Sequence, residues 1–185
     1  MAKRKDKRVA IVAGVGPGLG VALVRKLAGE DCCVGMFARS PEFIGELATE
    51  LGADALAVPT DVSNAKQVAA GFRKVREKLG PVEILIAHAS GSVGEGLMKT
   101  TPDQFEQSWR VAVLGAFLCA REAVPDMLRN ERAQLFSPAP LLRCAGAAVR
   151  FHLVAQSSRC ADWHNRLPSN CGQKVFMWHM SSSIA

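Results

Sequence analysis

The segment that most constrains the fold is residues 8–20, RVAIVAGVGPGLG. A short apolar run ends at Gly14, and Gly18 and Gly20 follow at fixed spacing. This pattern predicts a buried strand that turns directly into a helix whose first turn carries few side chains. Such a turn lets backbone N–H groups and the positive end of the helix dipole approach a pyrophosphate. The segment therefore predicts a dinucleotide-binding βα unit.

Strand and helix patterns alternate up to about residue 133. The expected strands cover residues 8–13, 33–38, 55–59 and 82–87, and the expected helices cover residues 17–28, a segment that begins at Pro41, a segment capped by Ser63, and residues 102–130. This alternation predicts an α/β fold, a Rossmann-like doubly wound parallel sheet with helices on both faces.

Two helices carry apolar stripes that should face the sheet. In the third helix the stripe has helical spacing and consists of Val68, Phe72, Val75 and Leu79. In the long helix the residues expected to face inward are Phe105, Trp109, Ala112, Ala116, Phe117, Ala120 and Val124.

Residues 134–185 differ in character from residues 1–133, because they show no sustained helical or strand period. We therefore divide the chain into a dinucleotide-binding region, residues 1–133, and an aberrant tail, residues 134–185. The strand order should be 3-2-1-4, and the sheet should be incomplete after strand four, so that residues 82–87 pair on one side only. Such an unpaired edge predicts marginal stability.

Composition excludes several classes of function. The net charge of +6 is divided between the two ends, because residues 1–8 and 134–185 each carry five Lys or Arg and one Asp, so we expect no nucleic-acid partner. No apolar run reaches the roughly 20 residues that cross a bilayer, and the start does not look like a secretory signal. Six scattered cysteines then fit a reduced, cytoplasmic compartment.

The tail also contains a set of cysteines and histidines without the tight Cys-x-x-Cys spacing of zinc knuckles, so no metal site is expected. The set is Cys144, His152, Cys160, His164, Cys171 and His179.

Residues 8–133 resemble the short-chain dehydrogenase/reductase family, whose glycine pattern G-x-x-x-G-x-G is matched by Gly14, Gly18 and Gly20. The resemblance implies that this turn, with Leu19, holds the cofactor phosphates. Asp61 and Val62 match the pair that lies against the adenine, although Asp61 could instead simply begin a turn.

Ala38 stands where an acidic residue would accept hydrogen bonds from the adenosine ribose, and Arg39 follows it. A guanidinium can hold a phosphate bidentately, so we expect NADP(H) rather than NAD(H) as the cofactor. After the fourth strand, Ala87 and Ala89 supply the small residues that the family needs close to the cofactor. His88 replaces an asparagine there.

The family's catalytic apparatus is missing. Members of the family use a tyrosine as proton donor and a lysine four residues later, whereas this sequence contains no tyrosine. Ala112 replaces the asparagine that supports a proton relay. The resemblance thus implies an oxidoreductase of carbonyl or alcohol substrates that has lost its catalytic residues. We do not expect this chain to form the homo-oligomer that is typical of the family.

A shifted reading frame after about residue 132 would explain the tail. If the codons of VFMWHMSSS are read one nucleotide out of frame, they can encode GIHVAHVVI. Neighbouring segments can encode strings that resemble the family's fifth strand, active-site helix and sixth strand, in the correct order. Three hypotheses follow: a cofactor-binding protein without turnover, an oxidoreductase that uses His88 or water as proton donor, and a non-enzymatic binding fragment or frame-shift product.

Overall fold

A computed structural model of the chain describes residues 7–91, 96–130, 133–137 and 176–180. Its strands are β1 (Arg8–Ala13), β2 (Cys32–Ala38), β3 (Ala55–Pro59), β4 (Val82–Ala87), β5 (Ala133–Ser137) and β6 (Phe176–Met180). The longer helices are α1 (Leu19–Gly29), α2 (Pro41–Leu51), α3 (Ala65–Lys78), α4 (Pro102–Trp109) and α5 (Gly115–Asn130). Shorter helical segments are η2 (Gly52–Asp54), η3 (Leu97–Lys99) and the π-helix η4 (Arg110–Leu114).

The described strands form one sheet in the order β3-β2-β1-β4-β5-β6, in which β1 to β5 are parallel and β6 is antiparallel to β5. The α/β class and the order 3-2-1-4 are therefore confirmed, and β1, β3 and β4 have the expected bounds. The expectation that β4 pairs on one side only is wrong, since Leu85 is in register with Leu135 of β5.

Leu135 is buried, which explains why this short apolar segment adds to the sheet beside β4. Most of the tail, including Cys144, His152, Cys160, His164 and Cys171, lies outside the described residues. The division of the chain at residue 133 remains a prediction.

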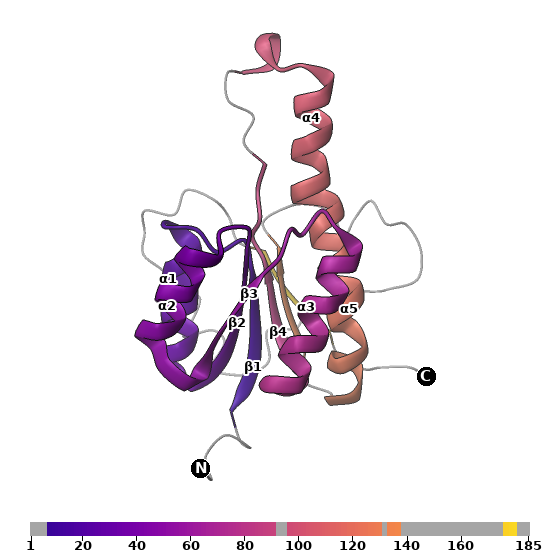
Figure 1. The fold of residues 1–185 in the computed structure, drawn as a ribbon. Helices are drawn as coiled ribbons and strands as arrows, with labels where there is room; N and C mark the ends of the chain where they lie inside the picture. Colours follow the sequence, from indigo (N-terminus) through magenta and orange to yellow (C-terminus); the bar gives the residue numbers. More distant parts are fainter. Residues whose placement is uncertain (1–6, 92–95, 131–132, 138–175, 181–185) are drawn as a thin grey trace, which may run out of the picture.

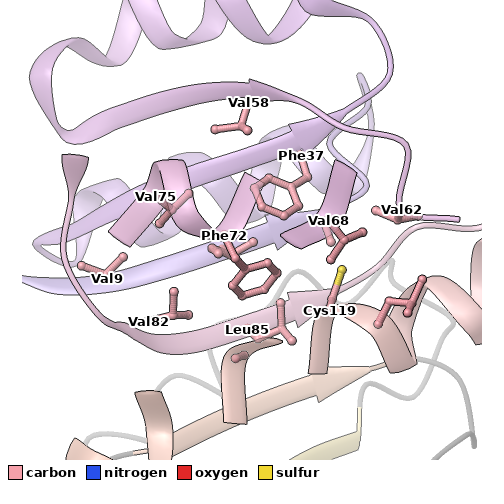
Figure 2. Packing of buried hydrophobic residues seen from close by; sticks show 14 of the residues in the cluster. Val9, Phe37, Val58, Val62, Val68, Phe72, Val75, Val82, Leu85 and Cys119 are labelled. Atoms are coloured by element: carbon pink, nitrogen blue, oxygen red, sulfur yellow. The ribbon is translucent and has the colours of Figure 1, made fainter. Parts of the chain in front are cut away.

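Helices cover both faces of the sheet, with α1 and α2 on one face and α3 and α5 on the other (Figure 1). Each layer has its own apolar cluster. In the cluster under α3 and α5, Phe37 of β2 meets Phe72 of α3 edge to face, with ring centroids 5.4 Å apart (Figure 2). The stripe predicted on α3 is confirmed, since Val68, Phe72 and Val75 are fully buried and Leu79 packs beside them.

The long helix predicted over residues 102–130 is interrupted, and its predicted inward face is partly wrong. Phe105, Trp109 and Phe117 are 63%, 46% and 51% exposed. For Phe117 the physical reason is η4, because a π-helical turn adds a residue to the helical repeat and rotates everything after it. Phe105 and Trp109 lie before that turn, in α4, which extends past the edge of the sheet (Figure 1). One continuous stripe therefore cannot describe both halves, and α5 instead buries Leu118, Cys119, Ala123 and Met127.

An ion pair between the half-buried Arg76 and the buried Asp126 connects α5 to α3 and to the start of β4. The Arg76 Nε donates to Oδ2 of Asp126 at 2.7 Å, and the backbone N–H of Val82 donates to the same oxygen at 3.2 Å. The Arg76 guanidinium also donates to the carbonyl of Glu122 and lies 5.6 Å from the Phe72 ring centroid. The Asp126 side chain is only 4% exposed, so these donors, together with Arg129 at 3.9 Å from its Oδ1, compensate for the loss of water around the carboxylate.

The substitution Arg76→Met should destabilise the fold strongly, because it keeps apolar volume beside Phe72 but leaves the buried Asp126 carboxylate with only the exposed Arg129, 3.9 Å away, as a cation. We expect a loss of about 3 kcal/mol in the free energy of unfolding, measured by urea denaturation. The control is Arg25→Met, which breaks the exposed two-bond pair with Glu50 and should leave the urea midpoint nearly unchanged. Equal losses in the two variants would contradict this role for Asp126.

Candidate functional site

A cavity of about 360 Å³ opens at the carboxyl ends of the parallel strands. This is the edge where open α/β sheets bind ligands, at the point where the chain crosses from one side of β1 to the other. Residues that directly follow β1, β2, β3 and β4 line the cavity, and Val111 of η4 completes it. The lining residues are Gly14, Val15, Gly16, Pro17, Gly18, Leu19, Gly20, Phe37, Ala38, Arg39, Thr60, Asp61, Val62, His88, Ala89, Ser90 and Val111.

The three motif glycines have different physical roles. Gly14 has a φ of +103°, and a Cβ there would lie 2.4 Å from the Ala89 nitrogen, so the turn after β1 packs directly on the backbone after β4. A Cβ at Gly20 would lie 2.8 Å from the Gly14 oxygen, which means that α1 packs against the same turn. A Cβ at Gly18 would meet nothing within 4 Å, so this position alone of the three opens onto free space.

The first turn of α1 presents backbone donors to the cavity. Gly18 is the N-cap and makes no side-chain capping bond, and Leu19 and Gly20 begin the helix. The first N–H groups of a helix have no partner within the helix, and the helix dipole adds partial positive charge there. The arrangement can hold an anion between the turn and the helix.

The ends of β2 and β3 form the second wall of the cavity. The Phe37 carbonyl accepts from the N–H groups of Gly14 and Val15, at 2.9 and 3.0 Å, and the Ala38 carbonyl accepts from the Thr60 N–H at 2.8 Å. These bonds fix the chain around Arg39, whose exposed side chain stands at the rim.

Asp61 both begins a turn and lines the cavity. Its Oδ1 accepts from the Ser63 N–H at 2.9 Å and from the Ser63 hydroxyl at 2.7 Å. The prediction that Ser63 caps the third helix is wrong for this reason. Asn64 is the N-cap instead, and its Oδ1 accepts from the N–H groups of Lys66 and Gln67.

The backbone after β4 forms the floor of the cavity. The His88 N–H donates to the Ala13 carbonyl at 2.8 Å, which continues the pairing of β4 with β1 past the ends of the strands. A Cβ at Gly91 would lie 2.4 Å from the Ser108 Cα, so the loop also packs tightly on α4. Any side chain at position 91 would therefore collide with the backbone of α4.

Eight of the nine predicted cofactor-binding residues line this one cavity: Gly14, Gly18, Leu19, Gly20, Arg39, Asp61, Val62 and Ala89. Ala87 does not, because it is the last residue of β4 and is buried in pairing with Ala13. Thr60 and Val111 were missed by sequence reasoning. Thr60 directly follows the predicted third strand, a signal that could have found it, whereas nothing in the sequence marks the π-helix that carries Val111.

Burial shifts the pKa values of one histidine in the cavity floor and of two cysteines in the core, and so sets their protonation states. Burial lowers the pKa of His88, so its imidazole is neutral at neutral pH. Burial raises the pKa of Cys32, and it raises that of Cys119 to about 12, so both thiols stay protonated and unreactive. Within the described ranges there is no group of His, Cys, Asp or Glu that could hold a metal ion.

Comparison with known proteins assigns the chain to a family. The family model for short chain dehydrogenases matches residues 8–136. The chain is 29% identical over 129 residues to meso-2,3-butanediol dehydrogenase of Serratia marcescens, covering 69% of this chain and 51% of that protein. It is 31% identical over 178 residues to a short-chain dehydrogenase/reductase of Pestalotiopsis microspora, covering 92% of this chain and 66% of that protein.

A solved structure agrees with the sequence matches. The 3-ketoacyl-(acyl-carrier-protein) reductase from Brucella melitensis, complexed with NADH, superposes with a TM-score of 0.64 at 29% identity, covering 67% of this chain and 52% of that one. The chain belongs to the short-chain dehydrogenase family. It spans about half the length of the first of these relatives and of this solved structure. Among the described helices, none has the length and apolar character to cross a membrane.

The substitution Gly18→Ala should block ligand binding without harming the fold. The added methyl meets no protein atom within 4 Å and enters the space in front of the first helical turn. We expect affinity for a nicotinamide dinucleotide to fall about tenfold or more, measured by calorimetry, while the melting temperature without ligand stays within about 2 °C. The control is Gly45→Ala in α2, where the new methyl also meets nothing, and where binding should not change. Full binding by Gly18→Ala would place the ligand elsewhere.

Proposed function

We propose that this chain binds a nicotinamide dinucleotide at the carboxyl edge of its sheet, prefers NADP(H) to NAD(H), and does not perform hydride transfer by the family's tyrosine-dependent route. The proposal extends the family assignment, which by itself implies an oxidoreductase that uses a nicotinamide cofactor. The observation that carries it is the position of Arg39 on the rim of the cavity that the glycine turn forms.

The residues of the cavity fit such a cofactor. The turn at Gly18 has room for a phosphate close to the backbone, since no protein atom lies within 4 Å of where a side chain would begin. The first turn of α1 supplies N–H donors and partial positive charge to a diphosphate. The free carboxylate oxygen of Asp61, opposite the one that Ser63 occupies, would accept a hydrogen bond from an adenine amino group.

Residues 38 and 39 support NADP(H) as the preferred form. An acidic side chain at the end of β2 would bind the ribose hydroxyls and repel a 2′-phosphate, whereas Ala38 does neither. Arg39 is exposed beside it and can reach a phosphate with two parallel N–H donors.

The lack of turnover follows from the chemistry that hydride transfer requires. As a carbonyl is reduced, the oxygen that gains negative charge needs a proton from a positioned acid. The sequence contains no tyrosine, and its last lysine is Lys174. Ala112, which lies in η4, has a methyl group that cannot hold a relay water. We also propose a cytoplasmic location, which is consistent with Cys32, Cys33 and Cys119 forming no disulfide in the described part of the chain.

The substitution Arg39→Ala tests the preference for NADP(H). It removes charge-assisted hydrogen bonds to the 2′-phosphate, so NADP⁺ affinity should fall by about tenfold or more, while NAD⁺ affinity stays within about twofold. Calorimetry with both cofactors measures the two effects. Arg73→Ala, an exposed arginine of α3 outside the cavity, is the matched control. Equal losses for both cofactors would overturn the preference, and no binding to either in the unaltered chain would overturn the function.

A second candidate function is an oxidoreductase that uses His88 as its acid or base. It is favoured by the position of His88 in the cavity floor and by its lowered pKa, since a neutral imidazole can accept a proton at neutral pH.

Cofactor oxidation separates the two candidates. With NADPH and a panel of aldehydes and ketones, the proposed function predicts no consumption of NADPH above the rate without protein, followed by absorbance at 340 nm. Measurable turnover that His88→Ala abolishes, while NADPH binding persists in that variant, would establish the second candidate instead.

A further inference from the structure

We propose that His88 takes up a proton when the dinucleotide binds, so that the chain holds its ligand more tightly as the pH falls. The imidazole then carries a positive charge beside the ligand's diphosphate. The inference rests on the proposed binding of a nicotinamide dinucleotide, and it adds a pH-dependent contact at that same site.

His88 lies beside the turn that is proposed to hold the diphosphate. Its N–H donates to the Ala13 carbonyl at 2.8 Å, and Ala13 is the residue directly before Gly14. β1 and β4 are neighbours in the sheet, and Ala13 is in register with Ala87. The backbone of His88 is therefore fixed next to the first residue of the glycine turn.

The side chain of His88 lies on the α1 face of the sheet. Along β4, Ile84 and Ile86 belong to the apolar cluster under α1 and α2, whereas Leu85 and Ala89 pack with the cluster under α3 and α5. Successive side chains of a strand point to opposite faces, so His88 shares the face of Ile84 and Ile86. Since α1 begins on this face, His88 and the first turn of α1 line the same cavity.

The first turn of α1 compensates only part of the charge of a diphosphate. A diphosphate that joins two nucleosides is doubly negative, whereas a helix N-terminus supplies roughly half an elementary charge. The proposed preference for NADP(H) assigns Arg39, at the rim after β2, to the 2′-phosphate. An anion close to an imidazole favours its protonated form, so a diphosphate in the turn raises the affinity of His88 for a proton.

Without ligand, the His88 imidazole is neutral at neutral pH. It is half-buried, and burial lowers its pKa below the ordinary value. The other titratable side chains in the described lining are Arg39 and Asp61, after β2 and β3, because the lining residues of the glycine turn, α1 and η4 carry none. Because the ligand raises the pKa of His88, the bound chain holds more protons than the free chain. Affinity therefore rises as the pH falls through the bound-state pKa, and levels off below the free-state pKa.

Calorimetry of NADP⁺ binding at about pH 6 and about pH 8, in buffers of different ionisation enthalpy, tests this inference. The 2′-phosphate of the ligand titrates in the same range, so the unaltered chain is compared with His88→Asn, whose side chain forms hydrogen bonds but does not titrate. We expect affinity to rise between the two pH values by roughly fivefold more in the unaltered chain, with about half a proton more taken up near pH 6, because one group changes affinity by at most about tenfold per pH unit.

Two controls isolate His88. His179→Asn makes the same change in β6, which is two strands away from β4 in the described sheet, and it should keep the proton uptake of the unaltered chain. NAD⁺ lacks the 2′-phosphate, so proton uptake on binding of NAD⁺ to the unaltered chain reports on the protein without any substitution.

The outcomes separate this inference from the function on which it rests. If the unaltered chain binds NAD⁺ without proton uptake, or if His88→Asn takes up as many protons with NADP⁺ as the unaltered chain does, the inference is overturned and the function stands. Equal loss of the uptake in His88→Asn and His179→Asn would also overturn it. If neither dinucleotide binds at either pH, both the inference and the function are overturned.

Discussion

The candidate site depends on the close approach of two backbone segments, the turn at Gly14 and the chain at Ala89. The Gly14 Cα faces the Ala89 nitrogen so closely that a Cβ would lie 2.4 Å from it, and the φ of +103° at Gly14 already favours glycine. Because β1 and β4 are neighbours, this contact joins the two strands between which the crevice opens. Any side chain at position 14 would push the walls of the cavity apart.

Similar close contacts bring the helices to the cavity. A Cβ at Gly20 would collide with the turn after β1, and one at Gly115 would lie 2.8 Å from Cγ2 of Val62. Gly115 directly follows η4, so the π-helical turn ends where the helix must press on the loop after β3. Val111 reaches the cavity from this turn, while α4 continues beyond the edge of the sheet with Phe105 and Trp109 exposed (Figure 1).

The sequence predicts the central sheet well because its strands are short apolar runs bounded by glycine, proline or polar residues, and their order follows from the alternation with helices. It fails where the outcome depends on a local competition. Ser63 and Asn64 are both residue types that cap helices well. Ser63 does not cap α3 because its hydroxyl and its N–H both donate to Asp61. The inward face after residue 110 was missed because a π-helix leaves no mark in the apolar pattern. The strand at Ala133–Ser137 was missed because it is short and the sequence that follows it has no period.

The same geometry shows which residues carry information about function. Gly14 and Gly20 are required by packing alone, so two of the three motif glycines would be needed in this fold even if no ligand ever bound. Gly18 and Arg39 are different, because Gly18 borders open space and the exposed Arg39 side chain stands at the rim of the cavity. Packing gives no reason for either residue, so the argument for a phosphate-bearing ligand depends on these two positions rather than on the glycine motif as a whole.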